Sequence, residues 1–556
     1  MSFSGNILKA DMDPVWLLRI FTVIPVVLIL VAGGGAIWIY FFVLSLLPQG
    51  QSVVETPGLS ADVRVVRDPH GVPGIIGERE EDLALVLGYV MAQDRLWQMD
   101  YLRRAGRGRL AEILGKDYLA SDHLIRTVTA GKKDVFSASR LGARERTWVE
   151  HFVRGINTYL DRHGHKPPVE FSLLEYRPRR FTPDDVMSII LAVAWYSSPG
   201  VRIDPVMTSL LAKLGKEKAL DLFPTDPAAP IPFVTSDLTG WVPRGGLFSI
   251  RGESPLPFRF PGFRGGCAWA VGPGKSKSGK PMVAVSVYQA LTAPGFWYRA
   301  RMSAGDFQLS GAFIPGVPVA MAGTNGKVGW GSVLAYADDA DLYLERLDSD
   351  DPAHYWRVDR PRRIKQINET YRIRGRARIS KPIRLTRTGP LVSDVIDGKA
   401  LSLRWTAREG LGLIESFYAV NRATDGKEAR SALKSLTAPC LNVVWGDHRG
   451  DFGIQTAGLV PVRPPGSDGI VPMPAWTGTH DWGGFIPFEE LPSDANPERG
   501  FTVVADGRPG GEDYPFLVSC YWNDDSRRSR IESLLKSDGE HFRESFQKIQ
   551  SDTGSS

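Results

Sequence analysis

The stretch "EDLALVLGYVMAQDRLWQMDYLRRAGRGRLAEILG", from Glu81 to Gly115, decides the fold of this chain. Leu83, Leu87 and Met91 have the spacing of the buried face of an amphipathic helix, and the pattern continues towards the end of the stretch. The spacing predicts one unbroken helix that stops at Gly115.

Outward from this helix, the sequence divides into a helix-rich and a strand-rich part. Helical patterns dominate residues 61–227. In residues 266–556 short apolar runs alternate with Gly, Asp and Asn turns, and a last helix is expected at about 524–550. Residues 228–265 are rich in Pro, Gly and Arg and are expected to connect the two parts.

One run in the strand-rich part imitates a phosphate-binding loop. "GKSKSGK", from Gly274 to Lys280, has the required glycines and lysine, but Pro281 stands where Ser or Thr would hold Mg²⁺. Since no helical pattern follows, a hairpin turn is expected instead.

The N-terminal region contains 28 residues without a charge, from Ile20 to Leu47, which exceeds the roughly 20 that cross a bilayer. Lys9 and Arg19 precede the run, and no positive charge follows before Arg64. The excess of positive charge on the N-terminal side predicts cytoplasmic residues 1–19, a single-pass anchor in the inner membrane at 20–47 and a linker at 48–60. The main domain is then expected in the periplasm.

Composition excludes several classes of function. Lys and Arg total 67 and Asp and Glu total 62, and no basic stretch interleaved with aromatic residues is apparent, so no nucleic-acid partner is expected. The three cysteines lie far apart, which predicts neither a disulfide framework nor a zinc site.

Several long motifs, in order along the chain, resemble those of the penicillin acylase (penicillin amidase) family. Together they span about residues 50–550. Besides the helix quoted above, they include "VRVVRDPHGVPGI" (63–75), "PPVEFSLLEYRPRRFTPDD" (167–185), "GTNGKVGWG" (323–331), "LNVVWGDHRGDFGIQTAGLVPVR" (441–463) and "NPERGFTVVADGR" (496–508).

The resemblance implies an α+β fold, the four-layer αββα sandwich of the N-terminal nucleophile hydrolases. Such enzymes cut their own chain before a Ser, whose hydroxyl then attacks an amide carbonyl while its own α-amine acts as the base. The implied substrates are amides of small acyl groups, such as β-lactam side chains or acyl-homoserine lactones. The implied partner of this chain is therefore a small amide.

The nucleophile position of the family falls on a glycine here. The family Ser lies three residues before a Trp, and Trp269 places that position at Gly266 in "FRGGCAWAV". Because Gly266 has no side chain, it can neither attack a carbonyl nor start the acyl shift that releases a new N-terminus. This register predicts a degenerate site in a protein that acts as a binding or scaffold subunit or has no retained function.

Cys267 is the alternative nucleophile. A one-residue deletion would make it the N-terminal residue after self-cleavage, and cysteine is intrinsically a good nucleophile. However, successive side chains of a strand point to opposite faces, so Cys267 would need a β-bulge to replace residue 266. Whether the protein is a non-enzyme or an active amide hydrolase therefore stays open at this point, and the third reading of Cys267 is a small apolar core residue.

Other site residues follow from the resemblance. Asn442 matches the oxyanion-hole Asn, Leu334 matches the residue whose backbone N–H is the second donor, and Arg463 matches an Arg near the nucleophile's amine. By contrast, a polar site-facing segment of the family is replaced by the more apolar Val285–Gln289.

The resemblance also implies a structural Ca²⁺. Asp338, Asp341 and the carbonyl of Ala340 match family ligands, and Asp204 stands where the family has Glu. Hard oxygen ligands of this kind suit Ca²⁺. No organic cofactor is expected.

Family members usually continue well beyond the position that Ser556 occupies at the end of this sequence. The resemblance therefore implies that the C-terminal part of the family fold is missing, and a separate chain that supplies it is a further expected partner.

Overall fold

The computed structural model describes most of the main domain. The described residues are 14–46, 53, 55–198, 200–215, 218–219, 265–289, 292–392, 400–511, 513–523, 525–537 and 539–554. Most of the expected connector, 228–264, lies outside them.

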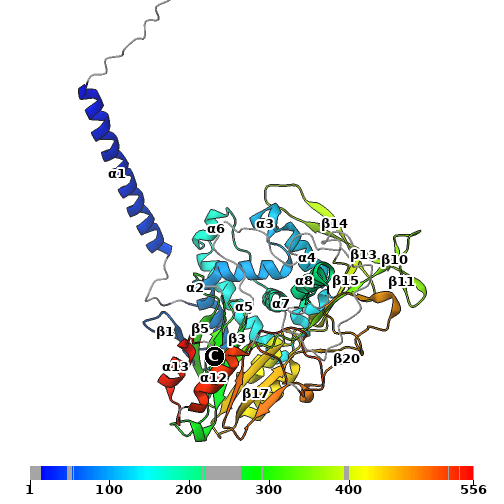
Figure 1. Cartoon of the computed structure of the whole chain (residues 1–556). Coiled ribbons are helices and arrows are strands. Elements are labelled where there is room, and N and C mark those ends of the chain that lie inside the picture. The colour runs from blue at the N-terminus through cyan, green and yellow to red at the C-terminus, as the bar shows by residue number, and fades with distance from the viewer. Residues whose placement is uncertain are drawn as a thin grey trace, which may run out of the picture.

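The helices gather mainly in the first half of the chain (Figure 1). Their bounds are α1 Pro14–Leu46, α2 Glu80–Arg107, α3 Ala111–Leu114, α4 Leu119–Thr129, α5 Ala143–His163, α6 Val169–Leu173, α7 Pro183–Ser197, α8 Gly200–Leu214, α10 Leu413–Val420, α11 Gly426–Ala432, α12 Ser526–Ser537 and α13 Arg543–Ser551.

A nine-stranded sheet forms the centre of the molecule. Its order is β1-β2-β5-β6-β7-β8-β16-β17-β21, and every pairing is antiparallel except that of β2 with β5. The strands are β1 Arg64–Arg67, β2 Pro73–Gly77, β5 Tyr298–Ala304, β6 Phe307–Phe313, β7 Ala320–Thr324, β8 Val328–Leu334, β16 Leu441–Asp447, β17 Phe452–Ala457 and β21 Ser493–Ala495.

A second sheet of three strands packs on the central one. It consists of β22 Phe501–Val504, β3 Gly266–Val271 and β4 Met282–Val287, with β3 in the middle. Small apolar side chains fill the space between the sheets, among them Ala268 and Ala270 of β3 against Val333 and Val444. Small residues allow the sheets to approach closely, which places the first residues of β3 next to β8 and β16.

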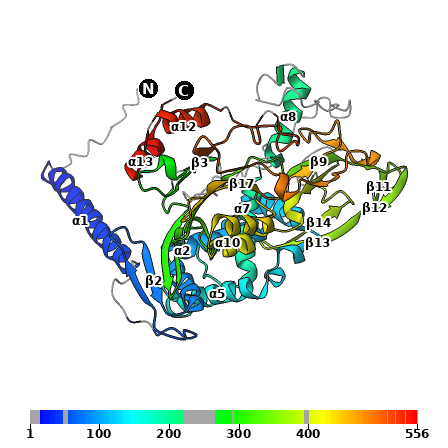
Figure 2. The same ribbon diagram turned by 90° about the horizontal axis from the view of Figure 1, so that it is seen from below.

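Helices cover the outer face of each sheet. The large core cluster joins the central sheet to α2, α5, α7 and α10, and a separate cluster joins β3 and β22 to α12 and α13. Figure 2 shows α12 and α13 on one side of the strands and α2 and α5 on the other. The molecule therefore has the layer order helix, sheet, sheet, helix, and the expectation of a mixed α+β fold is confirmed.

Short strands form further small sheets at the side of the body. They are β10 Arg346–Leu347 with β11 His354–Arg357 and β12 Arg360–Arg363; β13 Lys365–Tyr371 with β14 Ile379–Leu385; β15 Leu401–Trp405 with β9 Ala340–Leu344 and β19 Met473–Pro474; and β18 Pro461–Val462 with β20 Gly484–Phe485.

Two expected helices differ from the structure. α2 ends at Arg107, because Gly108 adopts the left-handed conformation (φ 56°) and the chain resumes helical structure only in α3. The single last helix expected at about 524–550 is in fact two helices, α12 and α13. The hairpin turn expected at 274–280 is present between β3 and β4.

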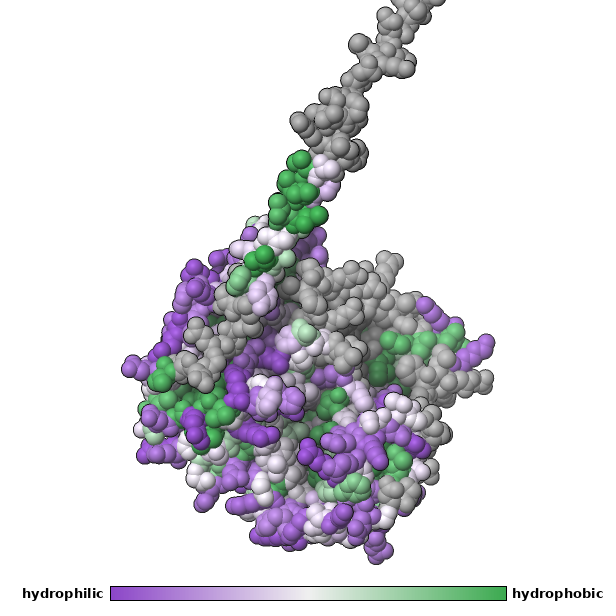
Figure 3. Space-filling model, turned by 90° about the vertical axis from the view of Figure 1, so that its left-hand side faces the viewer, coloured by the Kyte–Doolittle hydropathy of each residue, from purple (hydrophilic) through white to green (hydrophobic). Residues whose placement is uncertain are grey.

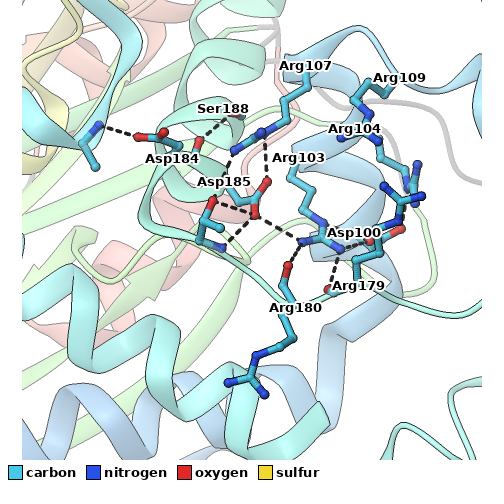
Figure 4. A network of polar contacts seen from close by, with 12 residues as sticks. Asp100, Arg103, Arg104, Arg107, Arg109, Arg179, Arg180, Asp184, Asp185 and Ser188 are labelled. Carbon is cyan, nitrogen blue, oxygen red and sulfur yellow. Dashed lines mark hydrogen bonds and ion pairs between the residues drawn. The ribbon is translucent and has the colours of Figure 1, made fainter. Parts of the chain in front are cut away.

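Buried ion pairs fix α2 against the segment that leads into α7 (Figure 4). Asp100 of α2 accepts hydrogen bonds from Arg103 Nε at 2.9 Å, Arg104 Nε at 2.8 Å and the hydroxyl of Tyr176 at 2.7 Å. Arg103 also pairs with Asp185 of α7 at 3.3 Å. The same stretch that forms the helix therefore also supplies its polar attachment.

The apolar side chains of α1 are exposed in its described part, and Figure 3 shows this helix standing clear of the body. Among the residues whose placement is described, no helix combines the length and the apolarity that crossing a membrane requires. The anchor expected at 20–47 is thus not supported by the structure and stays a prediction.

Candidate active site

Gly266 is the first residue of β3, and neighbouring strands close over the place where a side chain would stand. A Cβ added to Gly266 would come within 2.6 Å of the carbonyl oxygen of Ser286 and 2.9 Å of Cγ1 of Val333. Backbone contacts this short require the strand to move. The position matched to the family nucleophile therefore has no reactive side chain, and its neighbours leave no space for one.

The backbone N–H of Gly266 has a defined partner, since it donates to Oδ1 of Asp506 at 2.7 Å. The other oxygen of Asp506 accepts from Nη1 of Arg527 at 2.7 Å. Burial raises the pKa of Asp506, and the bonds from Gly266 and Arg527 oppose that rise. Gly265, with φ 135°, leaves no room for a side chain because its Cβ would lie 2.7 Å from Asp506 and 2.8 Å from the hydroxyl of Tyr336.

Cys267 points away from the space between the sheets. It is 4% exposed and joins the cluster of Trp269, Phe501 and the residues of α12 and α13. The pairing of β3 with β4 is continuous from Gly266 to Val271, so no β-bulge turns the thiol to the other face. The opposite orientation of positions 266 and 267, expected from the sequence, is thus what the structure shows.

The environment of Cys267 does not activate it. Its Sγ lies 3.1 Å from the hydroxyl of Tyr288, whose ring is covered by the guanidinium of Arg527 at 4.2 Å. Burial raises the pKa of the Cys267 thiol, and the hydrogen bond from Tyr288 and the charge of Arg527 only partly oppose it. A nucleophilic cysteine needs the reverse, since the thiolate is the reactive form.

Asn442 lies on the face of β16 that meets the three-stranded sheet. It pairs directly with Val333 of β8, the residue against which a side chain at 266 would press. Its Oδ1 accepts a hydrogen bond from the hydroxyl of Thr456 at 2.7 Å, which leaves its Nδ2 as the donor towards any bound carbonyl. Leu334 is the next residue of β8, and its side chain packs into the large core on the opposite face.

The segment 285–289 lies beside these residues. Val285 packs between the sheets, and Tyr288 donates its backbone N–H to the carbonyl of Gly265 at 2.9 Å. The structure therefore uses this segment to hold the glycine pair and to cover Cys267.

Sequence reasoning did not identify Asp506, Tyr288 or Arg527 as neighbours of the glycine pair. Asp506 belongs to the quoted motif "NPERGFTVVADGR", and a conspicuous acidic residue directly after a buried strand was the available signal. Arg527 lies in α12 and carried no motif.

A family model named penicillin amidase matches residues 62–556. The chain belongs to the penicillin amidase family. It is 30% identical over 530 residues to the acyl-homoserine lactone acylase QuiP of Pseudomonas aeruginosa, with 91% of this chain and 62% of the relative covered. It is also 30% identical over 504 residues to penicillin acylase 2 proenzyme of Pseudomonas sp. strain SE83, with 88% and 64% covered. The chain thus spans less than two thirds of the length of these relatives.

Among solved structures, the thermostable penicillin G acylase from Alcaligenes faecalis in its orthorhombic form shares 22% identity with this chain. The superposition covers 51% of each chain with a TM-score of 0.44.

Arg463, the penicillin amidase family's expected neighbour of the nucleophile amine, lies elsewhere in this chain. It is buried and pairs through Nη2 with Asp341 Oδ1 at 2.7 Å and with Asp338 Oδ2 at 2.9 Å. The N–H of Gly266 is instead held by Asp506. The structure therefore brings Arg463 to the expected calcium ligands and not to the glycine pair.

The four residues matched to calcium ligands converge at the start of α8. A Cβ added to Gly200 would lie 2.5 Å from Oδ1 of Asp338 and 2.9 Å from the carbonyl oxygen of Ala340, so these two oxygens face the same place. Both carboxylate oxygens of Asp204 are buried and accept no hydrogen bond from the described residues. Burial, followed by repulsion from Asp338, raises the pKa of Asp204.

These oxygens do not enclose an ion as they stand. Asp341 is held by Arg463 and by Nε1 of Trp482 at 2.6 Å. Within the described ranges, no group of three His, Cys, Asp or Glu residues is arranged to hold a metal ion. Asp204, Asp338 and the carbonyl of Ala340 supply oxygen atoms of the kind that hard cations prefer, and Arg463 pairs with both Asp338 and Asp341.

Proposed function

We propose that this penicillin amidase family protein binds small amides without hydrolysing them. The observation that carries the proposal is the glycine at position 266, on the side of β3 that faces Asn442, with no space for a nucleophile. The thiol one residue later points to the opposite layer and has a raised pKa. The amide class comes from the family and from the relatives named above.

Asn442 gives the proposed binding a chemical basis. Its Nδ2 is oriented as a donor by the bond from Thr456 to Oδ1. A preorganised donor can also bind the neutral carbonyl of an amide, although more weakly than an oxyanion, and without a nucleophile no oxyanion forms. Binding and catalysis are therefore separable in this site.

The first test is the covalent state of the full chain. Purified protein is analysed by denaturing gel, intact mass and N-terminal sequencing, and then incubated with an acyl-homoserine lactone and with penicillin G. We expect a single chain in which the peptide bond between Gly265 and Gly266 is intact, and we expect no release of the acyl group from either amide. A fragment that begins at Cys267, with hydrolysis lost in Cys267→Ala but kept in Cys520→Ala, would establish the active amidase with Cys267 as its nucleophile.

The second test measures binding directly, because an inert protein would also pass the first one. The same two amides are titrated by calorimetry against the wild-type chain, Asn442→Ala and the exposed control Asn368→Ala. We expect binding that Asn442→Ala weakens about tenfold or more and Asn368→Ala leaves unchanged, as removal of a hydrogen bond to a buried donor implies. Equal affinity in all three proteins would exclude Asn442 as the amide donor.

We further propose that residues 20–47 anchor the protein in the inner membrane with the main domain in the periplasm. The uncharged run and the positive charges before it support this orientation. Carbonate extraction of membranes tests it: the full chain is expected to stay in the pellet, and quantitative release into the supernatant would contradict the anchor.

We also propose a structural Ca²⁺ held by Asp204, Asp338 and the carbonyl of Ala340. The bare, buried carboxylate of Asp204 supports it, since such a group is normally compensated by a partner or an ion. Asp341 is assigned to Arg463 instead. The dependence of thermal stability on calcium tests this site, with Asp204→Asn as the variant that should not respond.

A further inference from the structure

The positive charge of this chain is concentrated in one segment. Twelve of the 31 residues from 357 to 387 are Lys or Arg and two are Asp or Glu, so the segment has a formal charge of +10. The whole chain has a net charge of +5, which means that the remaining residues carry a net −5. The molecule is therefore strongly polarised, although its total charge is small.

The segment folds into two neighbouring hairpins, β11–β12 and β13–β14, which lie side by side in Figures 1 and 2 and far from α12 and α13. Three of its arginines define what we call the basic face. They lie together in the loop between β13 and β14, are exposed and have no ion pair among the described residues: Arg372, Arg376 and Arg378.

The basic face is held rigidly. The hydroxyl of Tyr371 lies 2.8 Å from Nδ1 of His123, and Nη1 of Arg126 donates to the carbonyl of Thr370 at 2.8 Å. At the loop, Arg374 donates its backbone N–H to the carbonyl of Ala111 at 2.9 Å. The exposed arginines are thus presented by a fixed surface, which reduces the entropy lost when a partner is bound.

The apolar residues of the hairpins mostly point inwards, although Val358 is exposed. Ile383 and Leu385 pack on Ala130, and Ile364 packs with Tyr355 and Leu391. The loop 372–378 therefore offers charge without a large exposed apolar side chain and without an aromatic ring on which a base could stack. This composition favours a partner that is a uniformly charged anionic surface over a single-stranded nucleic acid, which aromatic side chains normally bind.

We propose that the basic face docks the protein on a bilayer rich in anionic phospholipid. Each Lys or Arg close to such a surface adds to binding, and the loop presents three together. The rest of the chain carries a net negative charge and is repelled by an anionic bilayer. The uneven distribution of charge therefore also orients the protein, with the basic face towards the bilayer. The inference does not depend on amide binding or on the anchor at 20–47.

Binding is tested with the full chain kept in micelles of a neutral detergent, so that α1 is occupied. The micelles are exchanged into nanodiscs of phosphatidylcholine, which are mixed with sedimentable vesicles of phosphatidylcholine alone or of phosphatidylcholine with phosphatidylglycerol. We expect co-sedimentation with the anionic vesicles only, and its loss when the salt concentration is raised to shorten the Debye length.

Two triple variants each remove three positive charges, one from the basic face and one from elsewhere on the surface. Arg372→Gln, Arg376→Gln and Arg378→Gln together are expected to weaken binding to anionic vesicles about 100-fold, from the contribution of each charge near a membrane surface. The control triple Lys427→Gln, Arg543→Gln and Lys548→Gln removes three exposed cations far from the basic face and is expected to bind like the wild type. Thermal unfolding of both triples checks that they are folded.

Three outcomes would overturn the proposal. One is equal binding to neutral and anionic vesicles, and another is equal loss in the two triple variants, which would indicate net charge alone. The third is tighter binding of a DNA duplex than of anionic vesicles at the same salt concentration, with the duplex affected only by the loop variant, which would assign the basic face to nucleic acid.

Discussion

Residue 266, which the resemblance matches to the family nucleophile, is a glycine whose neighbours leave no room for a side chain. Val333 and the carbonyl of Ser286 occupy the space of a side chain, and Asp506 holds the N–H. Restoring a serine would therefore need more than one substitution. These contacts support the proposal that residue 266 does not act as a nucleophile.

Gly266→Ala is expected to destabilise the protein by about 1–3 kcal/mol, because the added methyl group must displace backbone atoms of β4. The control is Gly274→Ala, at which an added Cβ meets nothing within 4 Å and which is expected to change stability by no more than about 0.5 kcal/mol. Urea unfolding of both variants measures the difference. Equal stability would mean that β3 can shift and that position 266 is not closed.

At the scale of elements, the sequence was informative wherever a local pattern decides the structure. The apolar spacing located α2, and the alternation of side chains along a strand placed residues 266 and 267 on opposite faces. The length of α2 was overestimated, because the pattern continues through Gly108 while the left-handed φ of that glycine ends the helix. Partners distant in sequence, such as Arg463 and Asp341, could not be paired by any local signal.

Because Asp100 attaches α2 through buried ion pairs, we expect its substitution by Asn to lower the stability of the fold strongly. Asp100→Asn leaves Arg103 and Arg104 buried with one charge partner fewer, so we expect a loss of about 3–5 kcal/mol. Asp161→Asn, which breaks an exposed pair with Arg180, is the control and should cost less than about 1 kcal/mol. Chemical denaturation at neutral pH compares them, and similar midpoints would contradict the structural role assigned to Asp100.

The carboxyl group of Asp100 should also make the stability of the fold depend on pH. Burial alone would raise the pKa of Asp100, but Arg103, Arg104 and Tyr176 outweigh it, so the pKa is lowered. A carboxyl group with a lowered pKa stabilises the fold above its unfolded pKa, about 4, and this contribution is lost as the pH falls through the lower folded value. The free energies of unfolding of the wild type and Asp100→Asn should therefore approach each other as the pH falls from 6 to 3. A constant difference between them would contradict this assignment.

For Asp122 of α4 we expect the opposite dependence of folding stability on pH. It accepts the backbone N–H groups of Leu110 and Ala111 at 2.8 Å and 2.7 Å, yet burial raises its pKa to about 7. A carboxyl group with a raised pKa stabilises the fold fully below its unfolded value, and this contribution is lost as the pH rises through about 7. We expect the stability of the wild type to fall from pH 4 to pH 8 more steeply than that of Asp122→Asn. Parallel curves would contradict the raised pKa.

At the scale of the whole molecule, the acidic cluster at the start of α8 joins the helix-rich part of the chain to the strand-rich part. Asp204 comes from α8, and Asp338 and Ala340 precede or begin β9. Arg463 neutralises Asp341 and shares Asp338, so the buried carboxylate of Asp204 is left without a partner among the described residues. A divalent cation at this place would link the two parts of the chain as well as compensate the charge.

Calcium is therefore expected to raise the thermal stability of the whole domain. Ligand that binds only the folded state stabilises it by about 2.7 kcal/mol at a concentration 100 times the dissociation constant, and chelation with EGTA should lower the melting temperature correspondingly. In Asp204→Asn the response to calcium should disappear. The matched control is Asp306→Asn, an exposed aspartate with no ion pair among the described residues, which should keep the full response. If the wild type is as stable in EGTA as in calcium, Arg463 compensates the cluster without an ion. The melting temperature of Arg463→Met should then fall below that of Asp204→Asn, because Asp338 and Asp341 would both lose the cation that pairs with them.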